Sequence, residues 1–527
     1  MDRKTINEIL GSDMAQHDRR FLTYCIERED ILQSLRDENE QLLVLNAPRG
    51  SGKSGLLLQL NRDLNKCPRH IVINKISGQV EYPRENLDVH GYVNFWNTQL
   101  LGWLFTEIGR QPQIAFSEAA INAVEYAEKK GAKQKNIVTH VLDKINFKAL
   151  PIERAKMDPV VRHEEVLGLI KTIDKNFWLL LDEFDDSYDN TERFNTILAG
   201  LLISAQTISQ LVTNVKIRIT VRPHVMKILE STFDKIPTLR ETQISVGWTT
   251  EQLGAILARR IESYLERTGD DMEALIAGTL SEKHVRSRQE ALIRLYFQNF
   301  DLEFDSPFGN ENKTWITQTL ATISMYRPRW LIEYCKLCLE ACNIPPVSST
   351  EARSALYKFG KNRIAFLQAE HRAIYAKIEL MLNQFSTYGK NSFPSSNSLR
   401  SFIVAKIIGV GILPTMPECV DTASLQIARF LHMIDFIQGK QSLGPGVYKH
   451  HHFIDRPELF SSWTEHPDLR WVIHPSFANA LDLDGNRSYR AGEQIKQAKP
   501  KYVELQEPLP GFTEAQKPAP RRRKRRH

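Results

Sequence analysis

Short apolar runs and stretches of helical periodicity follow one another through the first half of the chain. Apolar or β-branched runs predict five strands, at residues 42–45, 71–76, 177–181, 215–221 and 243–246. Helical periodicity predicts helices at 27–35, 93–108 and 118–130. Strands that alternate with helices predict an α/β domain built on a parallel sheet.

From residue 249 onward the pattern becomes helical. Thr249 and Gln252 form a capping-box pattern that begins a helix, and helical periodicity continues far beyond it. Two helices at about 399–409 and 422–438, followed by strands at 448–454 and 469–473, predict a small winged-helix module. The predicted domains are an N-terminal helical segment (1–40), a P-loop core (41–248) with a helical insertion (115–163), a helical lid (249–384), a winged-helix-like domain (399–481) and a disordered basic tail (482–527).

The segment after the first strand has the pattern of a phosphate-binding loop, Ala-Pro-Arg-Gly-Ser-Gly-Lys-Ser at 47–54. Two glycines allow backbone N–H groups to turn toward an anion, Lys53 can reach the β- and γ-phosphates, and Ser54 can place its hydroxyl on Mg²⁺. Ala47 replaces the usual first glycine and is tolerated if that position does not need a positive φ. We therefore expect ATP and Mg²⁺, with nucleotide contacts from Ala47, Pro48, Arg49, Gly50, Ser51, Gly52, Lys53, Ser54 and Gly55. The short helix at 27–35 is expected over the adenine side of this nucleotide.

A cluster of acidic residues follows the strand at 177–181. Asp182 would hold the Mg²⁺ shell, and Glu183 would orient or deprotonate the attacking water. An acidic cluster after an apolar strand is often a solvated loop, but its position about 130 residues after the phosphate loop favours a catalytic site. Asp185 and Asp186 could take the water-positioning role or cap a helix near Thr191.

Arginines in two regions of the chain are candidates for sensing the γ-phosphate. Thr220 and Arg222 follow the strand at 215–221, and ligands of open α/β sheets gather at such strand ends. The alternative is that Arg222 caps the strand and pairs with an acidic surface group. In the lid, Arg329 or Arg327 could reach back to the phosphates, or instead stack on Trp330 or pair with Glu333.

Charge and composition limit the possible partners. The chain has 527 residues, is 42% hydrophobic and carries a formal net charge of +6, and the six cations at 521–526 match that excess alone. Nucleic-acid attraction must therefore come from the tail or from a local patch such as the hairpin with Lys449 and Arg456. The most apolar stretch, 402–413, contains Lys406 and is too short to span a bilayer, so we expect a soluble cytoplasmic protein without membrane contact.

Cysteine and histidine clusters do not predict a metal site. Cys335, Cys338 and Cys342 line one helix face without a histidine or a turn nearby, which favours buried thiols over a metal or iron–sulfur centre. Successive residues of an extended segment point to opposite faces, so the three histidines at 450–452 cannot all bind one metal. An exposed hairpin is the simpler explanation for them.

The motifs at 47–54, 181–183, 220–223 and 326–329 together resemble the AAA+/STAND group of P-loop ATPases. Within it, the chain is similar to the prokaryotic branch related to origin-recognition ATPases, some of whose members occur in bacterial defence loci. The resemblance covers roughly residues 20–480, including a closing segment at 471–477. It implies that Asp182 binds Mg²⁺, that Glu183 is the catalytic glutamate, and that Arg222 and Arg329 are the sensor arginines.

Two functions remain compatible with these residues. In the first, the chain is an ATPase whose hydrolysis changes the angle of the lid and winged helix and acts on DNA or an effector protein, with anti-phage defence as one context. In the second, it is a nucleotide-gated DNA-binding regulator or oligomerising scaffold with negligible turnover. Glu183 favours the first, because a chain that only binds nucleotide needs no carboxylate at the water position. A homo-oligomer or an effector complex is expected in both cases.

Overall fold

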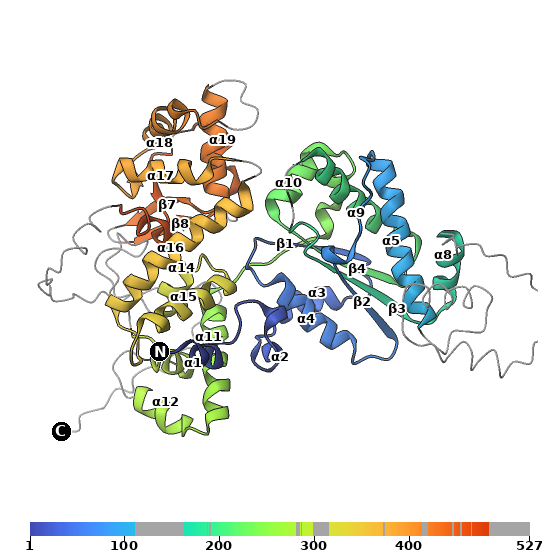
Figure 1. Ribbon diagram of the computed structural model, residues 1–527, viewed down its shortest axis with the longest axis horizontal. Coiled ribbons are helices and arrows are strands. Elements are labelled where there is room, and N and C mark those ends of the chain that lie inside the picture. Colours follow the sequence, from blue (N-terminus) through green and yellow to red (C-terminus); the bar gives the residue numbers. More distant parts are fainter. Residues whose placement is uncertain are drawn as a thin grey trace, which may run out of the picture.

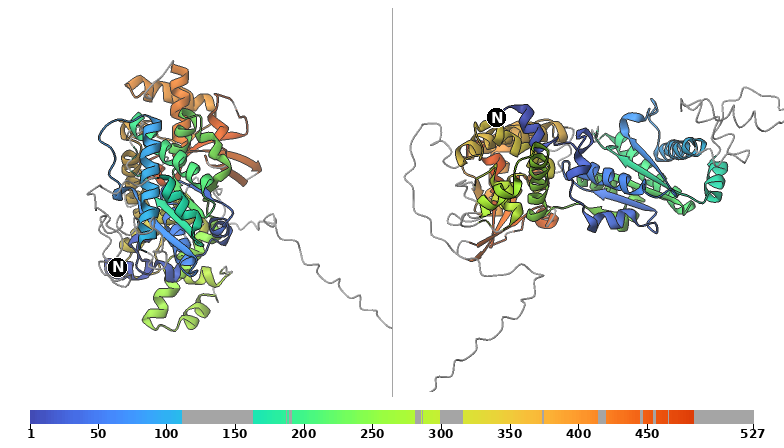
Figure 2. Two further views of the ribbon diagram at one scale, coloured as in Figure 1. Left: turned by 90° about the vertical axis from the view of Figure 1, so that its right-hand side faces the viewer. Right: turned by 90° about the horizontal axis from the view of Figure 1, so that it is seen from below.

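The computed structural model describes residues 1–110, 163–298, 316–413 and 420–483, apart from 187, 189–190, 281–284, 286, 373–374, 445–446, 454–455 and 465. Two bodies lie side by side (Figures 1 and 2). One is built around a parallel sheet, and the other consists of helices with a small antiparallel sheet. The N-terminal helix α1 (Arg3–Leu10) lies in the helical body, although the next hundred residues belong largely to the sheet body.

A five-stranded parallel sheet forms the centre of the first body. Its strands are β1 (Leu42–Asn46), β2 (His70–Ile76), β3 (Asn176–Asp182), β4 (Val215–Val221) and β5 (Gln243–Ser245), in the order β2-β3-β4-β1-β5. All five predicted strands are present, and the α/β P-loop fold class is confirmed. Because β1 and β3 both pair with β4, the residues that follow these strands meet at one edge of the sheet.

Helices cover both faces of this sheet. Alternate side chains of β3 show the division: Phe177, Leu179 and Leu181 pack in one cluster with α5 (Val89–Gly109) and α9 (Glu192–Leu211). Trp178 and Leu180 pack in the opposite cluster with α3 (Glu29–Arg36) and α4 (Lys53–Leu64). Burial on both sides explains why β3 is continuously apolar. Two further helices of this body are α8 (His163–Thr172) and α10 (Pro223–Thr232).

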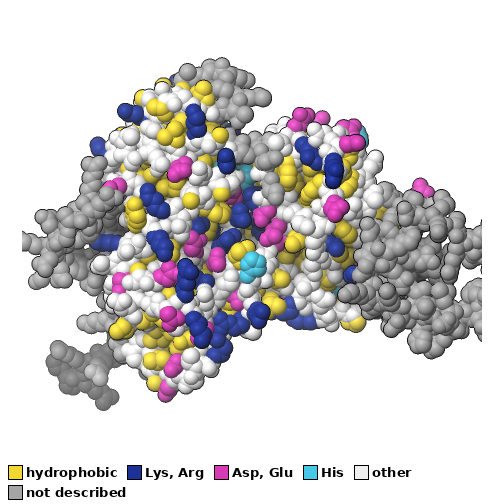
Figure 3. Space-filling view, viewed as in Figure 1, with side chains coloured by type: hydrophobic (Ala, Val, Ile, Leu, Met, Phe, Trp, Pro, Cys, Tyr) yellow, Lys and Arg dark blue, Asp and Glu magenta, His cyan; other side chains and the backbone are white. Residues whose placement is uncertain are grey.

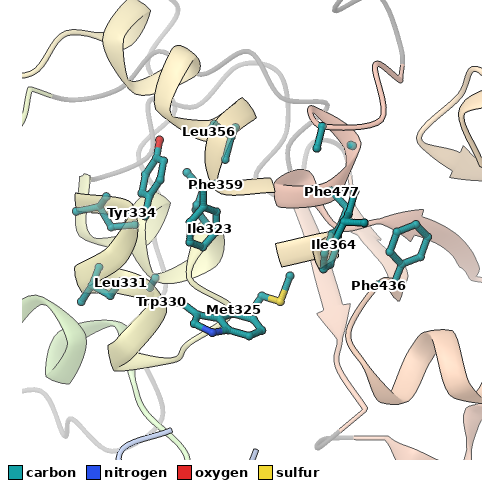
Figure 4. Packing of buried hydrophobic residues seen from close by; sticks show 14 of the residues in the cluster. Ile323, Met325, Trp330, Leu331, Tyr334, Leu356, Phe359, Ile364, Phe436 and Phe477 are labelled. Carbon is teal, nitrogen blue, oxygen red and sulfur yellow. The ribbon is translucent and has the colours of Figure 1, made fainter. Parts of the chain in front are cut away.

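The helical body has one continuous apolar core. Its elements are α11 (Thr250–Thr268), α12 (Met272–Leu280), α13 (Arg288–Arg294), α14 (Ile316–Ile323), α15 (Pro328–Ala341) and α16 (Ser349–His371). The predicted capping box of Thr249 and Gln252 is confirmed at the start of α11. Figure 4 shows Trp330 and Tyr334 of α15 near Phe359 of α16, with Phe477 of the C-terminal segment in the same cluster. The apolar side chains of this core therefore join the helices to the C-terminal part.

Helices precede a four-stranded antiparallel sheet in the C-terminal part. The elements are α17 (Ile378–Tyr388), β6 (Ser392–Phe393), α18 (Ser396–Phe402), α19 (Val420–Met433), β7 (Ile437–Gly444), β8 (Val447–His451), β9 (Leu469–Ile473) and α20 (Pro475–Ala478). The sheet order is β6-β9-β7-β8. Helical turns continue from α18 to Val410.

The predicted helix at 422–438 extends too far, and the strands predicted at 448–454 and 469–473 do not pair with each other as a hairpin. Helix α19 ends at Met433, Asp435 takes a positive φ of 56°, and β7 begins at Ile437. The hairpin joins β7 to β8, while β9 pairs with the other side of β7. The sequence did not indicate β7, because it contains polar residues such as Gln438 and Lys440 and because the apolar periodicity of α19 continues up to its start.

The histidines of β8 are less exposed than predicted. His451 is 3% exposed, and both ring nitrogens of His450 are buried. Cys335, Cys338 and Cys342 are buried thiols, as expected. Among the described residues, no group of three or more histidine, cysteine or acidic side chains could hold a metal ion.

Several predictions fall on other parts of the chain. The helix at 118–130, nearly all of the insertion at 115–163, and the tail beyond Leu483 with its cations at 521–526 lie outside the described residues. Within the described ranges, none of the helices combines the length and apolarity that a bilayer span requires.

Candidate nucleotide-binding site

The phosphate loop connects β1 to α4 with two glycines in left-handed backbone conformations. Gly50 has a φ of 84° and Gly52 a φ of 87°, which turns successive N–H groups to one side as in an anion-binding nest. Ala47 is buried with no positive φ, so alanine is accommodated where the usual pattern has glycine. Most of the predicted loop residues line a cavity, namely Pro48, Arg49, Gly50, Gly52, Lys53, Ser54 and Gly55, whereas Ala47 and Ser51 are buried.

Trp248 packs against this loop and also lines the cavity. Its indole N–H donates to the carbonyl of Ser51 at 2.7 Å, and a Cβ on Gly52 would lie 3.2 Å from its ring. The guanidinium of Arg28 stacks on the indole, 4.9 Å from the ring centroid. Glycine at position 52 is therefore required by both backbone conformation and space.

Lys53 folds back onto its own loop. Its ammonium donates to the carbonyls of Ala47 at 2.5 Å and Pro48 at 3.3 Å. Burial lowers the pKa of Lys53, and the nearby carboxylate of Asp185 offsets part of that effect. A phosphate at this place would give the ammonium charged acceptors, which form stronger hydrogen bonds than neutral carbonyls.

Asp182 ends β3 opposite the loop and is held in one orientation. Its Oδ1 accepts the Thr220 hydroxyl at 2.6 Å and the Glu183 N–H at 3.0 Å. Its Oδ2 is directed toward the cavity, where the amide of Gln16 donates to it at 3.4 Å. A carboxylate oxygen and the Ser54 hydroxyl, both on this cavity, are the hard oxygen ligands that Mg²⁺ prefers, so these residues fit that ion.

Glu183 has an unusual backbone conformation, with a φ of 62°. Non-glycine residues rarely adopt such angles, and they concentrate at functional sites. Its Oε1 accepts the side-chain amide of Gln16 at 3.0 Å, and burial raises the pKa of its carboxyl group. The conformation directs a carboxylate to the cavity immediately after the Mg²⁺ candidate.

Arg222 is 3% exposed and is surrounded by three carboxylates. Its backbone N–H donates to Asp185 at 2.7 Å, its guanidinium donates to Asp186, and an ion pair reaches Glu370 of α16 at 3.5 Å. Burial alone would lower the pKa of Arg222, but these carboxylates raise it. Asp185 and Asp186 therefore hold Arg222, and Glu370 connects it to the helical body. Arg222 also lines the cavity.

The two lid arginines have different positions. Arg329 lines the cavity, its backbone N–H donates to the Gly50 carbonyl at 3.2 Å, and its side chain pairs with Asp13 at 3.3 Å. Arg327 is buried elsewhere, 4.0 Å above the Trp330 ring and paired with Asp435 at 3.1 Å. Of the two, Arg329 is the one placed to reach a phosphate.

A cavity of about 150 Å³ joins these groups between the two bodies. Basic and acidic side chains lie close together along this junction (Figure 3). The lining includes several residues that the sequence did not predict: Asp13, Gln16, Phe21, Tyr24, Trp248 and Arg260. Residues 13–26 supply one wall, whereas α3, expected over the adenine side, packs against α4 instead. Only the position of Trp248, next to a capping box, offered a sequence signal.

No family model matches this chain. No curated protein matches it either. Among solved structures, an ORC2 protein of Aeropyrum pernix in ADPNP–ADP complexes is similar at 10% identity and a TM-score of 0.39, covering 88% of this chain and 96% of that one. The Aeropyrum pernix ORC1 protein in complex with DNA is similar at 12% identity and a TM-score of 0.33, covering 91% and 98%.

Cdc6p of Pyrobaculum aerophilum is similar at 11% identity and a TM-score of 0.30, covering 90% of this chain and 96% of that one. All three TM-scores lie below 0.5, and all three identities are 12% or lower. At these values the likeness assigns the chain to no family, and the function has to be argued from the residues of the cavity.

Proposed function

We propose that the chain is a Mg²⁺-dependent ATPase that works as a nucleotide-driven switch on DNA or on an effector protein. One observation carries this proposal: the positive-φ phosphate loop with Lys53 and the Asp182–Glu183 pair line the same cavity, at the ends of the two strands that flank β4. Anion donors on one side and hard carboxylate oxygens on the other suit a Mg²⁺-bound triphosphate.

Each group has a proposed role in phosphoryl transfer. Lys53 and the loop N–H groups would bind the β- and γ-phosphates, and Glu183 would orient the attacking water or accept its proton. Ser54 and Asp182 would hold Mg²⁺, which would supply positive charge to offset the charge that develops during transfer. Arg329, a cavity-lining cation of the lid, and Arg222 would stabilise charge on the transferring group.

Contacts between the two bodies support the switch. Two contacts cross from core to lid. One is the ion pair between Arg222 and Glu370, and the other is the hydrogen bond from the backbone N–H of Arg329 to the Gly50 carbonyl. A ligand that changes the partners of Arg222 or Arg329 would therefore change the angle between the proposed core (41–248) and lid (249–384). The proposed N-terminal segment (1–40) lies on both of them.

The C-terminal part (399–481) is the proposed output module. Its order of helix, strand, two helices and a hairpin supports a winged-helix arrangement. Lys440 and Arg470 are opposite each other on β7 and β9, which gives one face of the sheet a basic character. Arg456 contributes less than expected, because it pairs with Glu458 at 2.7 Å. This face and the tail are the proposed contacts with DNA.

Calorimetry with ATP and Mg²⁺ tests the binding step. Lys53→Ala should weaken affinity about 30- to 1000-fold, because the loop loses its charged donor to the phosphates. Lys66→Ala, an exposed lysine just after α4, is the matched control and should bind as the wild type does. Equal ATP affinity in Lys53→Ala and the control would contradict the proposed site.

Phosphate release separates the ATPase from a scaffold with negligible turnover. Glu183→Gln should keep ATP affinity and lose turnover, because the amide cannot accept a proton from water. Arg329→Ala should keep ADP affinity and slow hydrolysis on the order of 10²-fold. A wild-type chain that binds ATP but releases no phosphate faster than Glu183→Gln would establish the scaffold instead.

A further inference from the structure

The N-terminal segment crosses the candidate site on its way from one body to the other. Helix α1 packs in the core of the helical body, with Ile6, Ile9 and Leu10 buried there. Residues 12–17 then pass along the cavity, and Phe21 reaches the first turn of α4, where a Cβ on Gly55 would lie 2.8 Å from its ring. We call residues 12–17 the gate segment.

Asp13 of the gate segment pairs with the guanidinium of Arg329, to which the proposed function assigns phosphate binding. Its Oδ2 lies 3.3 Å from Nε of Arg329, and both side chains are about one-third exposed or less. A carboxylate is the natural protein substitute for a phosphate oxygen on arginine, because both present paired anionic acceptors to the guanidinium. A triphosphate could bind Arg329 only after Asp13 leaves.

Gln16 of the gate segment contacts the two acidic residues of the site. Its side-chain NH₂ donates to Oε1 of Glu183 at 3.0 Å and to Oδ2 of Asp182 at 3.4 Å. The other oxygen of Asp182 is already used by Thr220 and the Glu183 N–H. Gln16 therefore takes the one Asp182 oxygen directed at the cavity and a catalytic carboxylate oxygen together, which are the positions that a hydrated cation would need.

The path of the gate segment is built into the fold. Arg260 of α11 donates to the carbonyls of Leu10 and Ser12, pairs with Asp18 at 3.5 Å and stacks on the Tyr24 ring at 4.7 Å. The carboxylate of Asp18 in turn accepts the Ser12 N–H at 2.9 Å and the Tyr24 hydroxyl.

Gly11, with a φ of 64°, fits between these groups, because a Cβ there would lie within 3 Å of Tyr24, Asp18 and Arg260. Both ends of the segment are thus fixed, while Gln16 itself is exposed. The segment can move at its middle and remain attached to α1 and to Arg260.

We infer that the gate segment is an autoinhibitory contact: Asp13 and Gln16 hold the phosphate and metal positions of the site, and Mg²⁺-bound ATP must displace both. This inference rests on the proposed function. Since the segment is continuous with α1 in the helical body, its displacement also transmits nucleotide binding to the lid. The two contacts differ in kind. Asp13 competes with the phosphates for Arg329, and Gln16 competes with the metal for the carboxylates of Asp182 and Glu183.

Calorimetry with a non-hydrolysable ATP analogue tests the gate. Asp13→Ala and Gln16→Ala should each tighten binding with Mg²⁺ by up to about 5-fold, and the double variant by about 10- to 30-fold, because each removes one charged contact that competes with the ligand. Without Mg²⁺ the gain from Gln16→Ala should shrink, whereas that from Asp13→Ala should remain. Glu8→Ala and Gln33→Ala, both exposed and outside the cavity lining, are the matched controls.

Hydrogen exchange gives an independent measurement. In the wild-type chain the amides of residues 14–17 should exchange faster when the analogue and Mg²⁺ are bound, because the turn in which the His17 N–H donates to the Met14 carbonyl is disturbed. Unchanged or weaker binding by the double variant, or slower exchange of these amides on binding, would overturn the gate while leaving the ATP site in place. If neither the wild type nor the double variant binds the analogue, the proposed function and the gate both fail.

Discussion

His474 should make the contact between the helical body and the C-terminal segment sensitive to acid. The ring is 1% exposed; its Nε2 lies 3.1 Å from the Thr322 carbonyl, and its Nδ1 accepts the Ser476 N–H at 3.2 Å. These two partners require a neutral ring that donates from Nε2 only. Burial lowers the pKa of His474 from 6.5 to about 3, and the nearby His452 and Arg327 act in the same direction against Asp435.

The sign of the effect follows from proton binding in the two states. The unfolded chain takes up a proton near pH 6.5 and the folded ring only near pH 3, so stability is intact above pH 6.5 and falls as the pH drops through that interval. At pH 5 the unfolded ring is almost fully protonated while the folded ring is neutral. The loss between pH 7 and pH 5 is therefore about 2 kcal/mol for this one residue.

Urea unfolding of wild type and His474→Gln at pH 7 and pH 5 measures this difference. The wild type should lose about 2 kcal/mol more than the variant over that interval, because only its unfolded state gains the extra proton. Other buried histidines, such as His371 with a pKa lowered to about 4 by burial, affect both proteins equally and cancel. His90→Gln, exposed on α5, is the control and should retain the wild-type slope. Equal pH dependence in wild type and His474→Gln would refute the reasoning.

Three further changes test other parts of the molecule. Gly52→Ala should weaken ATP binding by at least about 10-fold in calorimetry, because it strains the loop and contacts Trp248, whereas Gly269→Ala, at a φ of 75° in open space, should not. Arg222→Ala should lower the free energy of unfolding by about 3–5 kcal/mol, because Asp185 and Glu370 would stay buried without their cation; an unchanged urea midpoint would contradict this. Deleting residues 515–527 should leave ATP turnover unchanged. In filter-binding assays on duplex DNA, the logarithm of the binding constant should fall with the logarithm of salt concentration at a slope of about −4 to −5 for the full chain, and the deletion should remove most of that slope. Identical slopes would assign DNA contact to the hairpin around Lys449.

The parts of the fold that depend on contiguous residues were predictable. The phosphate loop, the five strands and the α11 cap each follow from a local pattern of apolar residues, glycines or capping groups. The meeting of Lys53, Asp182 and Thr220 also followed, because parallel strands bring their carboxyl ends to one edge. Their proposed chemical roles remain predictions.

The remaining features depend on pairs distant in sequence. Asp13 and Arg329 are 316 residues apart, and nothing in either neighbourhood indicates the other. The partner of Arg222 in the helical body, Glu370, lies within a long helix whose periodicity shows burial but not which residue it meets. Strand β7 was missed because a half-polar strand directly after a helix has no boundary residue such as glycine or proline.

The backbone of Glu183 gives this protein a conflict between stability and activity. A non-glycine residue with positive φ costs of order 1–3 kcal/mol, and asparagine or glycine would adopt a φ of 62° more easily. Burial adds a second penalty, since it disfavours the charged carboxylate. A screen for thermostable variants would therefore select replacements at this position and discard the group proposed to activate water. Directed evolution of the chain for robustness should hold residue 183 fixed and seek its gains elsewhere.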